Sequence, residues 1–513
     1  MTGNKQGKLA LKNQPFSLQL FLCTLTGALM PLAFAPFAVW PLAIILPALI
    51  LLLVDAEKTA RRIFLKGWCF GLGYFGFGVY WIYNSLHDFG MAPPLVAAAM
   101  TALLVMFLSV FPALTLNAWQ SIQRRTGQKP IWLLPVLWFA FEWLRGWLLT
   151  GMPWLSLGYA LIESPLAGFA PLIGVYGLSA LAVLIAVVLV HVIKTKAFSY
   201  LAIVILLPAL GFGLQQVEWT EQQASSLDVT IVQGNIPQQI KWQYDQRHNI
   251  FNTYWRETEQ YWDSDLIVWP ETALPDQSEN IRQSLLEPVA KIAAARGSHI
   301  LSGIVVSDQA NQKFYNSMLL LGANEAVYHK RHLVLFGEYY PLRWLLDFMS
   351  HLINIPHSDL EPGPEQQPLM QVNGLLLGIS ICFEDAFSRD IMLSIPAANL
   401  LVNASNDAWF GDSLAPHQHL QIARMRALET GRAMVRATNT GISAFIDFRG
   451  RIIVQSEQFK TQSLTQAITG RTGVTPFYYF AKLQPWIVLV ILFALLMVRL
   501  KRGFKKKQGN ITE

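Results

Sequence analysis

Residues 13–54 read NQPFSLQLFLCTLTGALMPLAFAPFAVWPLAIILPALILLLV and contain no Asp, Glu, Lys or Arg. A helix that crosses a lipid bilayer needs about 20 consecutive apolar residues. The 42 residues of this stretch therefore predict two crossings, joined by a turn between Pro31 and Pro41. Residues 33–35 (Ala-Phe-Ala) would also suit the cleavage site of a signal peptide, but a second apolar run follows at once, which favours a retained anchor.

More apolar segments follow this stretch towards the C-terminus. Five of them carry no acidic or basic residue, and a sixth, residues 131–150, contains only Glu142 and Arg145. Together with the two crossings in residues 13–54, these six segments predict about eight membrane spans, seven before residue 218 and one after residue 482. Core helices of a soluble protein are the alternative, but a soluble core does not need so many runs of this length. The five uncharged runs are residues 67–87, 89–123, 164–193, 197–217 and 483–498.

Basic residues lie on alternate loops between these spans. They include 12 of the 13 Lys and Arg residues of positions 1–217, and a further basic cluster follows the last span. Because loops rich in Lys and Arg stay in the cytoplasm, both termini are predicted to be cytoplasmic. Seven crossings then place residues 218–482 on the periplasmic side. The bases on these loops are Lys5, Lys8, Lys12, Lys58, Arg61, Arg62, Lys66, Arg124, Arg125, Lys129, Lys194 and Lys196.

The composition agrees with a membrane protein. Hydrophobic residues make up 53% of the 513 residues and charged residues only 14%, which excludes a disordered chain. The formal charge is +8 for residues 1–217, −7 for residues 218–482 and +5 for residues 483–513. The overall charge of +6 therefore averages basic flanks and an acidic middle, and it does not indicate a protein that binds nucleic acid. Three cysteines are too few for a disulfide scaffold or a four-cysteine zinc site.

Residues 218–482 differ in pattern from the flanking segments. Short strand-like runs alternate with helical patterns at residues 280–296 and 415–437, which predicts a layered α/β domain large enough for its own core. The chain is thus predicted to divide into a seven-span domain (1–217), this α/β domain, and a last membrane helix with a basic tail (483–513). The strand-like runs are residues 228–233, 265–269, 300–306, 315–321, 375–381 and 400–403.

Two side chains that can carry chemistry follow buried strands of this domain. Cys382 comes directly after the apolar run of residues 375–381, and Glu271 follows residues 266–270, Leu-Ile-Val-Trp-Pro. Sites of α/β proteins are built at such strand ends, and a helix N-terminus after the strand would lower the pKa of the thiol. The alternatives are a buried core thiol and an ordinary turn glutamate.

Lys330 and Glu338 lie eight residues apart and would complete a catalytic group. Alone, each is more often a solvated surface residue. Together with Cys382 they make chemical sense, because a carboxylate such as Glu271 can take the proton of a cysteine nucleophile and an ammonium group can stabilise the oxyanion. A thioester, and then acyl transfer to a second substrate, would follow. No metal or cofactor is predicted, since metal-ligand spacing is lacking among His329, His332, His417 and His419.

These residues resemble the Glu-Lys-Cys triad of the nitrilase, or carbon–nitrogen hydrolase, superfamily. The finer pattern resembles the bacterial apolipoprotein N-acyltransferase family over nearly the whole chain. Two packing or backbone positions depart from the family pattern: Leu335, where proline is usual, and Phe383, where tyrosine is frequent. The matching segments are residues 232–237 (Val-Gln-Gly-Asn-Ile-Pro) with Trp242, 269–271 (Trp-Pro-Glu), 330–338 (Lys-Arg-His-Leu-Val-Leu-Phe-Gly-Glu), 382–384 (Cys-Phe-Glu), 403–410 (Asn-Ala-Ser-Asn-Asp-Ala-Trp-Phe), 141–145 (Phe-Glu-Trp-Leu-Arg) and 151–154 (Gly-Met-Pro-Trp).

The resemblance implies an αββα sandwich for the middle domain and a two-step reaction at the bacterial inner membrane. An acyl chain, typically the sn-1 chain of phosphatidylethanolamine, would pass to Cys382 as a thioester and then to the α-amine of an apolipoprotein's N-terminal diacylglyceryl-cysteine. The implied partners are a phospholipid donor, the apolipoprotein acceptor and membrane lipid, without nucleic acid or cofactor, and a monomer suffices. The implied roles are base for Glu271, oxyanion stabiliser for Lys330, support for Glu338, Glu384 and Phe383, and substrate binding for Trp242 and Trp154.

Two further segments lead to hypotheses of their own. Glu142 and Arg145 lie three residues apart inside a predicted span, so they are expected to pair with each other, either to hold the bundle together or to meet a lipid headgroup. In residues 342–355, large apolar side chains recur at helical spacing. This predicts a helix that dips into the outer leaflet as a lid, or alternatively a helix of the core.

Two other functions would explain part of the sequence. A membrane-tethered nitrilase-type amidase would use the same triad with water as the acceptor, but such an enzyme would not need seven membrane spans. A transporter or channel with an outer sensory domain would account for the spans. Transporters often show internal repeats, however, and none is visible in this sequence.

Overall fold

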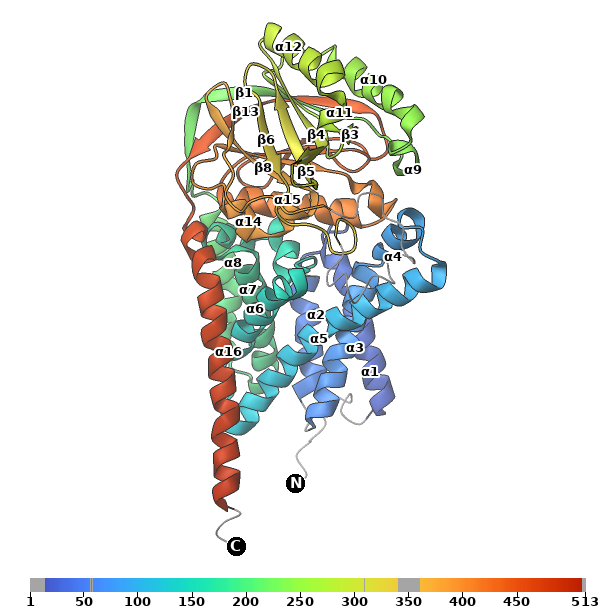
Figure 1. The fold of residues 1–513 in the computed structure, drawn as a ribbon. Helices are drawn as coiled ribbons and strands as arrows, with labels where there is room; N and C mark the ends of the chain where they lie inside the picture. The colour runs from blue at the N-terminus through green and yellow to red at the C-terminus, as the bar shows by residue number, and fades with distance from the viewer. Residues whose placement is uncertain (1–13, 56, 58, 309, 340–359, 510–513) are drawn as a thin grey trace.

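The computed structural model describes residues 14–55, 57, 59–308, 310–339 and 360–509. Figure 1 shows a helical bundle with an α/β domain above it, and α16 (Pro476–Gly509) runs along the bundle away from that domain. The helix predicted for residues 342–355 lies outside the described residues, so the lid stays a prediction.

A helix is present in each of the eight apolar segments that the sequence predicts to span the membrane. Among the described residues, four helices are long and apolar enough to cross a bilayer: Phe16–Ala33, Pro94–Thr126, Pro165–Thr195 and Pro476–Val498. Eight crossings therefore stay a prediction, because the remaining helices are shorter or more polar. The eight helices are α1 (Phe16–Ala28), α2 (Leu42–Asp55), α3 (Ala60–Gly78), α5 (Pro94–Thr126), α6 (Leu133–Arg145), α7 (Ala170–Thr195), α8 (Leu201–Leu214) and α16.

Small residues let two helices of the bundle approach closely. A Cβ atom added to Gly27 of α1 would lie 1.9 Å from the carbonyl oxygen of Phe70, and one added to Gly73 of α3 would lie 2.0 Å from that of Thr24. Only glycine therefore fits where α1 crosses α3. Close backbone contact at small residues is typical of helices that pack inside a membrane, where van der Waals contact drives association.

Glu142 and Arg145 do not form the ion pair that their spacing suggests. The Arg145 guanidinium instead donates to the carbonyl oxygens of Met152 and Trp154, each at 2.6 Å. The Glu142 carboxylate accepts from the backbone N–H of Leu157 at 2.9 Å. Both side chains therefore bind the irregular segment that follows α6, because its unpaired backbone groups offer stronger local partners than a second side chain on the same helix. The expected pairing is wrong, and the two residues hold this segment inside the bundle.

The α/β domain contains two β-sheets that pack face to face. Their strand orders are β13-β1-β2-β4-β5-β6, with β3 paired to β4, and β12-β11-β10-β9-β8-β7. Alternate apolar residues such as Val229 and Ile231 on β1 and Leu377 and Ile379 on β8 meet in one buried cluster between the sheets. The strands of the first sheet are β1 (Glu221–Gln233), β2 (Leu266–Val268), β3 (Leu274–Gln277), β4 (His299–Asp308), β5 (Lys313–Leu321), β6 (Ala326–His329) and β13 (Gln462–Thr472). Those of the second are β7 (Met370–Val372), β8 (Leu375–Ile381), β9 (Leu400–Ser405), β10 (Met434–Thr438), β11 (Ala444–Ile446) and β12 (Ile452–Gln455).

Helices cover the outer face of each sheet. On the first sheet, α10 (Arg247–Thr258) and α12 (Glu287–Ala295) bury residues such as Tyr254 and Val289 against the strands. On the second sheet, α14 (Ser388–Met392) and α15 (Ala415–Thr430) do the same. The domain is therefore an αββα sandwich, and all six predicted strand-like runs lie within strands of the two sheets or overlap them.

The helix predicted for residues 415–437 is too long. α15 ends at Thr430, and Gly431 follows with a φ of +63°, the left-handed conformation of a glycine C-cap. The chain then enters β10 at Met434. Residues 434–437 are all buried, and all are apolar except Arg436. The hydrophobic pattern of α15 therefore continues past Gly431, and hydrophobic periodicity alone does not mark the end of the helix.

α15 joins the α/β domain to the bundle. Figure 1 shows this helix at the base of the α/β domain, directly above the bundle helices. The backbone N–H of Val175 on α7 donates to the carboxylate of Glu429 at 2.7 Å, and Gln418 accepts a hydrogen bond from Trp154 at 2.7 Å. Both α15 side chains are almost fully buried. The sandwich is therefore fixed on the bundle at a defined orientation.

Candidate active site

Cys382 lies where β8 ends and a short 3₁₀-helix, η10 (Cys382–Ala386), begins. Its backbone has a φ of +51°, a left-handed conformation that is rare for residues other than glycine. The residue is only 8% exposed. Strained backbone persists where the surrounding structure enforces it, and such residues cluster at functional sites. The thiol thus occupies a sharp strand-to-helix turn, in the position that its sequence neighbours predict.

An ammonium group and two carboxylates lie together at the ends of neighbouring strands. Lys330 follows β6, and its Nζ lies 2.9 Å from Oε1 of Glu338 and 3.4 Å from Oε1 of Glu271. Asn316 on β5 donates through Nδ2 to both carboxylates, at 2.7 Å to Glu271 and 2.9 Å to Glu338. The structure therefore brings together three of the predicted residues, and it adds Asn316 as the bridge between the two glutamates.

The charges of this group act on the thiol. Burial raises the pKa of Cys382, the Glu271 carboxylate raises it further, and Lys330 offsets only part of that increase. Burial by itself would lower the pKa of Lys330, but Glu338 and Glu271 outweigh it and raise the pKa above its usual value. The lysine is therefore a permanent cation and the resting cysteine is a neutral thiol. Such a thiol needs a neighbouring base to become a nucleophile.

Glu271 is held in place from two sides. Its Oε2 accepts a hydrogen bond from the backbone N–H of Asn406 at 2.9 Å, and its backbone carbonyl accepts one from Nζ of Lys241 at 3.1 Å. Lys241 is only 1% exposed, and this burial lowers its pKa to about 8 although Glu271 and Cys382 act in the opposite direction. A second buried lysine thus lies within the electrostatic reach of the thiol.

Among the described residues, the Glu384 carboxylate forms no hydrogen bond or ion pair with Glu271, Lys330 or Cys382. Its Oε2 accepts from the backbone N–H of Ile381 at 2.6 Å, and its Oε1 accepts from those of Arg331 at 2.6 Å and His332 at 3.1 Å. The hydroxyl of Tyr328 also donates to this carboxylate. Glu384 therefore ties the strand end that carries the thiol to the segment that begins at Lys330. Burial raises the pKa of its carboxyl group to about 7.

The three predicted aromatic residues lie in different settings. Trp154 is 1% exposed, donates to Gln418, and lies with its ring 5.2 Å from that of His419. Phe383 is partly buried above it, at 6.1 Å between ring centroids. Trp242 is partly buried and follows α9 (Gln238–Lys241) directly. The substrate contacts of Trp242 and Trp154 and the supporting role of Phe383 stay predictions, and Trp154 would have to act through its neighbours because so little of it is exposed.

Four buried charged residues form a cluster directly behind the thiol. His419 on α15 lies 2.9 Å from Asp407 and 3.0 Å from Asp385, and Arg436 on β10 lies 3.0 Å and 3.2 Å from the same two carboxylates. His419 also contacts the backbone carbonyl of Cys382 at 3.3 Å. Burial and Arg436 lower the pKa of His419, but the two carboxylates outweigh them and raise it to about 9. The cluster thus holds two positive and two negative charges and fixes the backbone of Cys382.

Sequence reasoning missed Lys241, Asn316 and this charged cluster. Lys241 directly precedes Trp242 in a matching segment, and Asn316 is a polar residue inside an apolar strand, so both positions carried a signal. Of the cluster, only Asp407 lies in a matching segment, and the sequence does not indicate that the four residues meet, because they come from separate elements. Within the described ranges, no three His, Cys, Asp or Glu side chains are placed so that they could hold a metal ion.

A buried thiol, a carboxylate and a permanent ammonium at the strand ends of an αββα sandwich define a site of the carbon–nitrogen hydrolase class. Residues 228–477 match the family described as carbon-nitrogen hydrolase. Residues 26–188, which form most of the bundle, match the family described as apolipoprotein N-acyltransferase N-terminal domain. The α/β domain and the bundle therefore carry separate family signatures that agree with each other.

Relatives of nearly full length extend this agreement. The apolipoprotein N-acyltransferase of Methylococcus capsulatus is 38% identical over 508 residues, which cover 97% of this chain and 99% of the relative. That of Nitrosomonas europaea is 42% identical over 455 residues, covering 87% and 90% of the two chains. That of Coxiella burnetii is 37% identical and covers 93% and 99%. The chain belongs to the apolipoprotein N-acyltransferase family.

Proposed function

We propose that Cys382 accepts an acyl chain from a membrane phospholipid and passes it to the α-amine of an apolipoprotein's N-terminal diacylglyceryl-cysteine. Family membership makes the chain an acyltransferase of lipoprotein maturation, with lipid and apolipoprotein as its partners. One observation supports the proposed mechanism most directly. The buried Cys382, with its strained backbone, lies near a group in which Lys330 binds both Glu271 and Glu338. The sn-1 chain of phosphatidylethanolamine is the proposed donor group.

In the first step, Glu271 takes the proton of the Cys382 thiol as the sulfur attacks the ester carbonyl of the phospholipid. The Lys330 ammonium stabilises the oxyanion of the tetrahedral intermediate, which a permanent buried cation does effectively. The carbon–oxygen bond of the ester then breaks. The lysophospholipid leaves with the proton from Glu271, and the acyl chain stays on the sulfur as a thioester.

In the second step, the α-amine of the acceptor attacks the thioester carbonyl. Glu271 takes a proton from the amine, Lys330 again stabilises the oxyanion, and the carbon–sulfur bond breaks. The thiolate recovers its proton from Glu271, and the product is an amide. Glu338 and Asn316 keep Lys330 and Glu271 in position during both steps, because they bind these two side chains directly.

The position of the site suits substrates that are anchored in a membrane. Trp154 of the bundle packs against Phe383, the residue after the nucleophile, so the site lies at the face where the sandwich meets the bundle. We place residues 1–217 and the last helix in the bacterial inner membrane, residues 218–482 on the periplasmic side, and both termini in the cytoplasm. The alternating basic loops support this orientation. The protein is proposed to act as a monomer.

The mechanism is tested by the intact mass of the purified protein after incubation with phosphatidylethanolamine and no acceptor. We expect a gain of one acyl chain that is absent in Cys382→Ser and present in the matched control Cys69→Ser. A diacylglyceryl-cysteine peptide should then remove the adduct and appear as its N-acylated form. Lys330→Met should form no adduct, because the oxyanion loses its cation.

The competing amidase function predicts a different outcome of the same experiment. An amidase of this class would use the same residues but would hydrolyse a small amide without lipid and would form no adduct with phosphatidylethanolamine. A folded wild-type protein that stays unmodified in the presence of lipid would contradict the proposed mechanism. The family relationship and the extensive bundle favour lipid substrates over a small soluble amide.

A further inference from the structure

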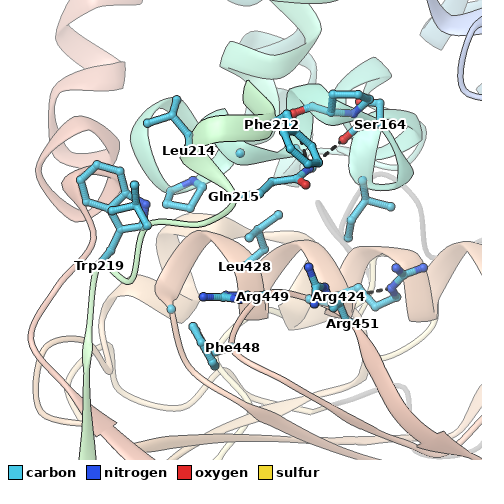
Figure 2. A pocket seen from close by; sticks show the side chains of 18 of the residues that line it. Ser164, Phe212, Leu214, Gln215, Trp219, Arg424, Leu428, Phe448, Arg449 and Arg451 are labelled. Carbon is cyan, nitrogen blue, oxygen red and sulfur yellow. Dashed lines mark hydrogen bonds between the residues drawn. The ribbon is translucent and has the colours of Figure 1, made fainter. Parts of the chain in front are cut away.

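A cavity lies between the bundle and the α/β domain, away from Cys382. Its volume is about 340 Å³, which is within the range of small-molecule sites, and its lining contains none of the residues of the active site. Figure 2 shows Phe212, Leu214 and Gln215 at the end of α8 on one side and Arg424 and Leu428 of α15 on the other. The cavity is therefore formed jointly by a membrane helix and by the helix that supports the sandwich.

The lining of this cavity is positively charged. It contains Arg424, Arg449 and Arg451 but only one acidic residue, Glu163. Glu163 pairs with Arg424, and Arg449 lies 3.2 Å from Glu218, which also binds Arg471 at 2.8 Å. Asp447 lies in the same turn, where the backbone amides of Arg449 and Arg451 bind it. The guanidinium of Arg451 has no hydrogen bond or ion pair within the described part of the chain, so a positive charge is available to a ligand.

Two buried N–H donors of the lining are also unsatisfied. Nε1 of Trp219 and Nε of Arg449 have no hydrogen-bond partner among the described residues. A buried donor without a partner costs about 1–3 kcal/mol. Donors of this kind, beside arginines, suit an oxygen-rich anion, because phosphate accepts several hydrogen bonds at once.

The apolar side of the cavity continues along a helix that faces lipid. Phe212 is 60% exposed, and Ile205, seven residues and so two turns earlier on the same side of α8, is 68% exposed. Residues 198–214 form an apolar helix. Large apolar side chains exposed along such a helix are covered by acyl chains when the helix lies in a membrane. The cavity therefore opens at the end of a lipid-facing surface, at the depth where headgroups lie.

We propose that this cavity binds the phosphate-bearing headgroup of an anionic phospholipid from the leaflet nearest the α/β domain. The guanidinium groups of Arg449 and Arg451 bind the phosphate, Nε1 of Trp219 donates to a headgroup oxygen, and the acyl chains lie along α8. The excess of basic over acidic side chains in the lining favours an anionic headgroup over a zwitterionic one. The bound lipid is a structural ligand and not the acyl donor, since the lining is separate from the active site.

Native mass spectrometry of the full chain in detergent tests the proposal. The delipidated protein is titrated with dioleoylphosphatidylglycerol, with dioleoylphosphatidylethanolamine or with inorganic phosphate. We expect one tightly held phosphatidylglycerol in the wild type. Its affinity should fall about tenfold or more in Arg449→Gln/Arg451→Gln, because each arginine near a lipid phosphate contributes roughly 1 kcal/mol.

Arg296→Gln is the matched control. It removes one exposed arginine of the α/β domain outside the cavity, so it should keep the affinity of the wild type. Arg451→Gln alone covers the case in which the double variant does not fold. The Arg451 guanidinium has no partner among the described residues, so the single variant should fold and should still bind several-fold more weakly.

Three results would overturn the proposal. The first is equal retention of phosphatidylglycerol by the wild type and the arginine variants. The second is equal retention of both phospholipids by the wild type, and the third is binding of inorganic phosphate with no lipid retained. All proteins in this experiment, the wild-type reference included, carry Cys382→Ser, so phosphatidylethanolamine forms no acyl adduct and the outcome is independent of the proposed acyl transfer.

Discussion

Lys241 is a charged residue near the thiol that loses its proton in mildly basic solution. Burial lowers its pKa to about 8, whereas Lys330 keeps its charge because two carboxylates bind it. Lys241 contacts the backbone of Glu271 and not its carboxylate. It therefore acts as a positioning residue and as a second positive charge within reach of Cys382. The site thus has one permanent cation and one that is lost in mildly basic solution.

Replacement of Lys241 by methionine should slow formation of the acyl adduct by about tenfold, less than the 10²–10³-fold loss seen when a direct oxyanion donor is removed. The wild-type rate should also fall above about pH 8 as Lys241 loses its proton, and this decline should be absent in Lys241→Met. Rates of adduct formation between pH 6 and 10 measure both effects. The exposed Lys291→Met variant should behave like the wild type. A decline above pH 8 that persists in Lys241→Met would assign it to another group.

His419 predicts a pH dependence of stability. Its folded pKa of about 9 lies above the ordinary value of 6.5, since Asp385 and Asp407 hold the charged form. Below pH 6.5 both the folded and the unfolded chain bind this proton, so the stabilisation is complete. Between pH 6.5 and 9 only the folded chain keeps it, so the contribution falls and is lost above pH 9. The difference in thermal stability between the wild type and His419→Gln should therefore shrink over this range, and a constant difference would contradict a charged His419.

At the scale of elements, α15 links the two parts of the molecule. Its Glu429 is fully buried, lies 3.0 Å from Arg426, and accepts the backbone N–H of Val175 on the bundle. Its Gln418 binds Trp154 and Trp81 of the bundle, and its His419 supports Cys382. One helix thus sets both the backbone of the nucleophile and its position relative to the bundle.

Replacement of Glu429 by leucine should lower the free energy of unfolding by about 3–5 kcal/mol, because it leaves Arg426 charged and buried without its partner. The double variant Arg426→Met/Glu429→Leu should recover much of this loss, since it removes both charges. Chemical unfolding in detergent micelles measures the changes. Glu457→Gln, which alters an exposed ion pair, is the control and should have no measurable effect. Equal destabilisation of the single and double variants would show that the ion pair is not the cause.

The sequence predicts the elements that carry a strong local pattern. The six strand-like runs and the eight apolar helices were recognisable because hydrophobic residues recur in them at short intervals and charged residues are rare. β3, β6, β7 and β10 to β13 were not predicted. All of these except β13 are short, and such strands take their stability from neighbours in the sheet. The expected Glu142–Arg145 pair was wrong because backbone carbonyls of the irregular segment that follows α6 compete for Arg145. Resemblance identified Glu271, Lys330 and Cys382, while Lys241 and the His419 cluster required the three-dimensional arrangement.

At the scale of the whole molecule, the junction between the bundle and the sandwich contains both sites at which we propose that lipids bind. The active site and the arginine-lined cavity both lie where the two parts meet, but they have separate linings. The proposed phospholipid donor and lipid-anchored acceptor can reach the junction between bundle and sandwich only if the sandwich lies on the side of the membrane where both substrates are present. The orientation of the bundle is therefore part of the mechanism.

Cysteine labelling tests this orientation. Lys291→Cys places a thiol on an exposed helix of the sandwich, and Gln128→Cys places one on an exposed loop after α5. In spheroplasts, a membrane-impermeant maleimide should label position 291 at once and position 128 only after the membrane is permeabilised, because the basic loop at 124–129 is predicted to be cytoplasmic. The wild type controls for reaction at its own three cysteines. The reverse pattern would put the thioester on the cytoplasmic side, and labelling of both positions in intact spheroplasts would mean an even number of crossings between them.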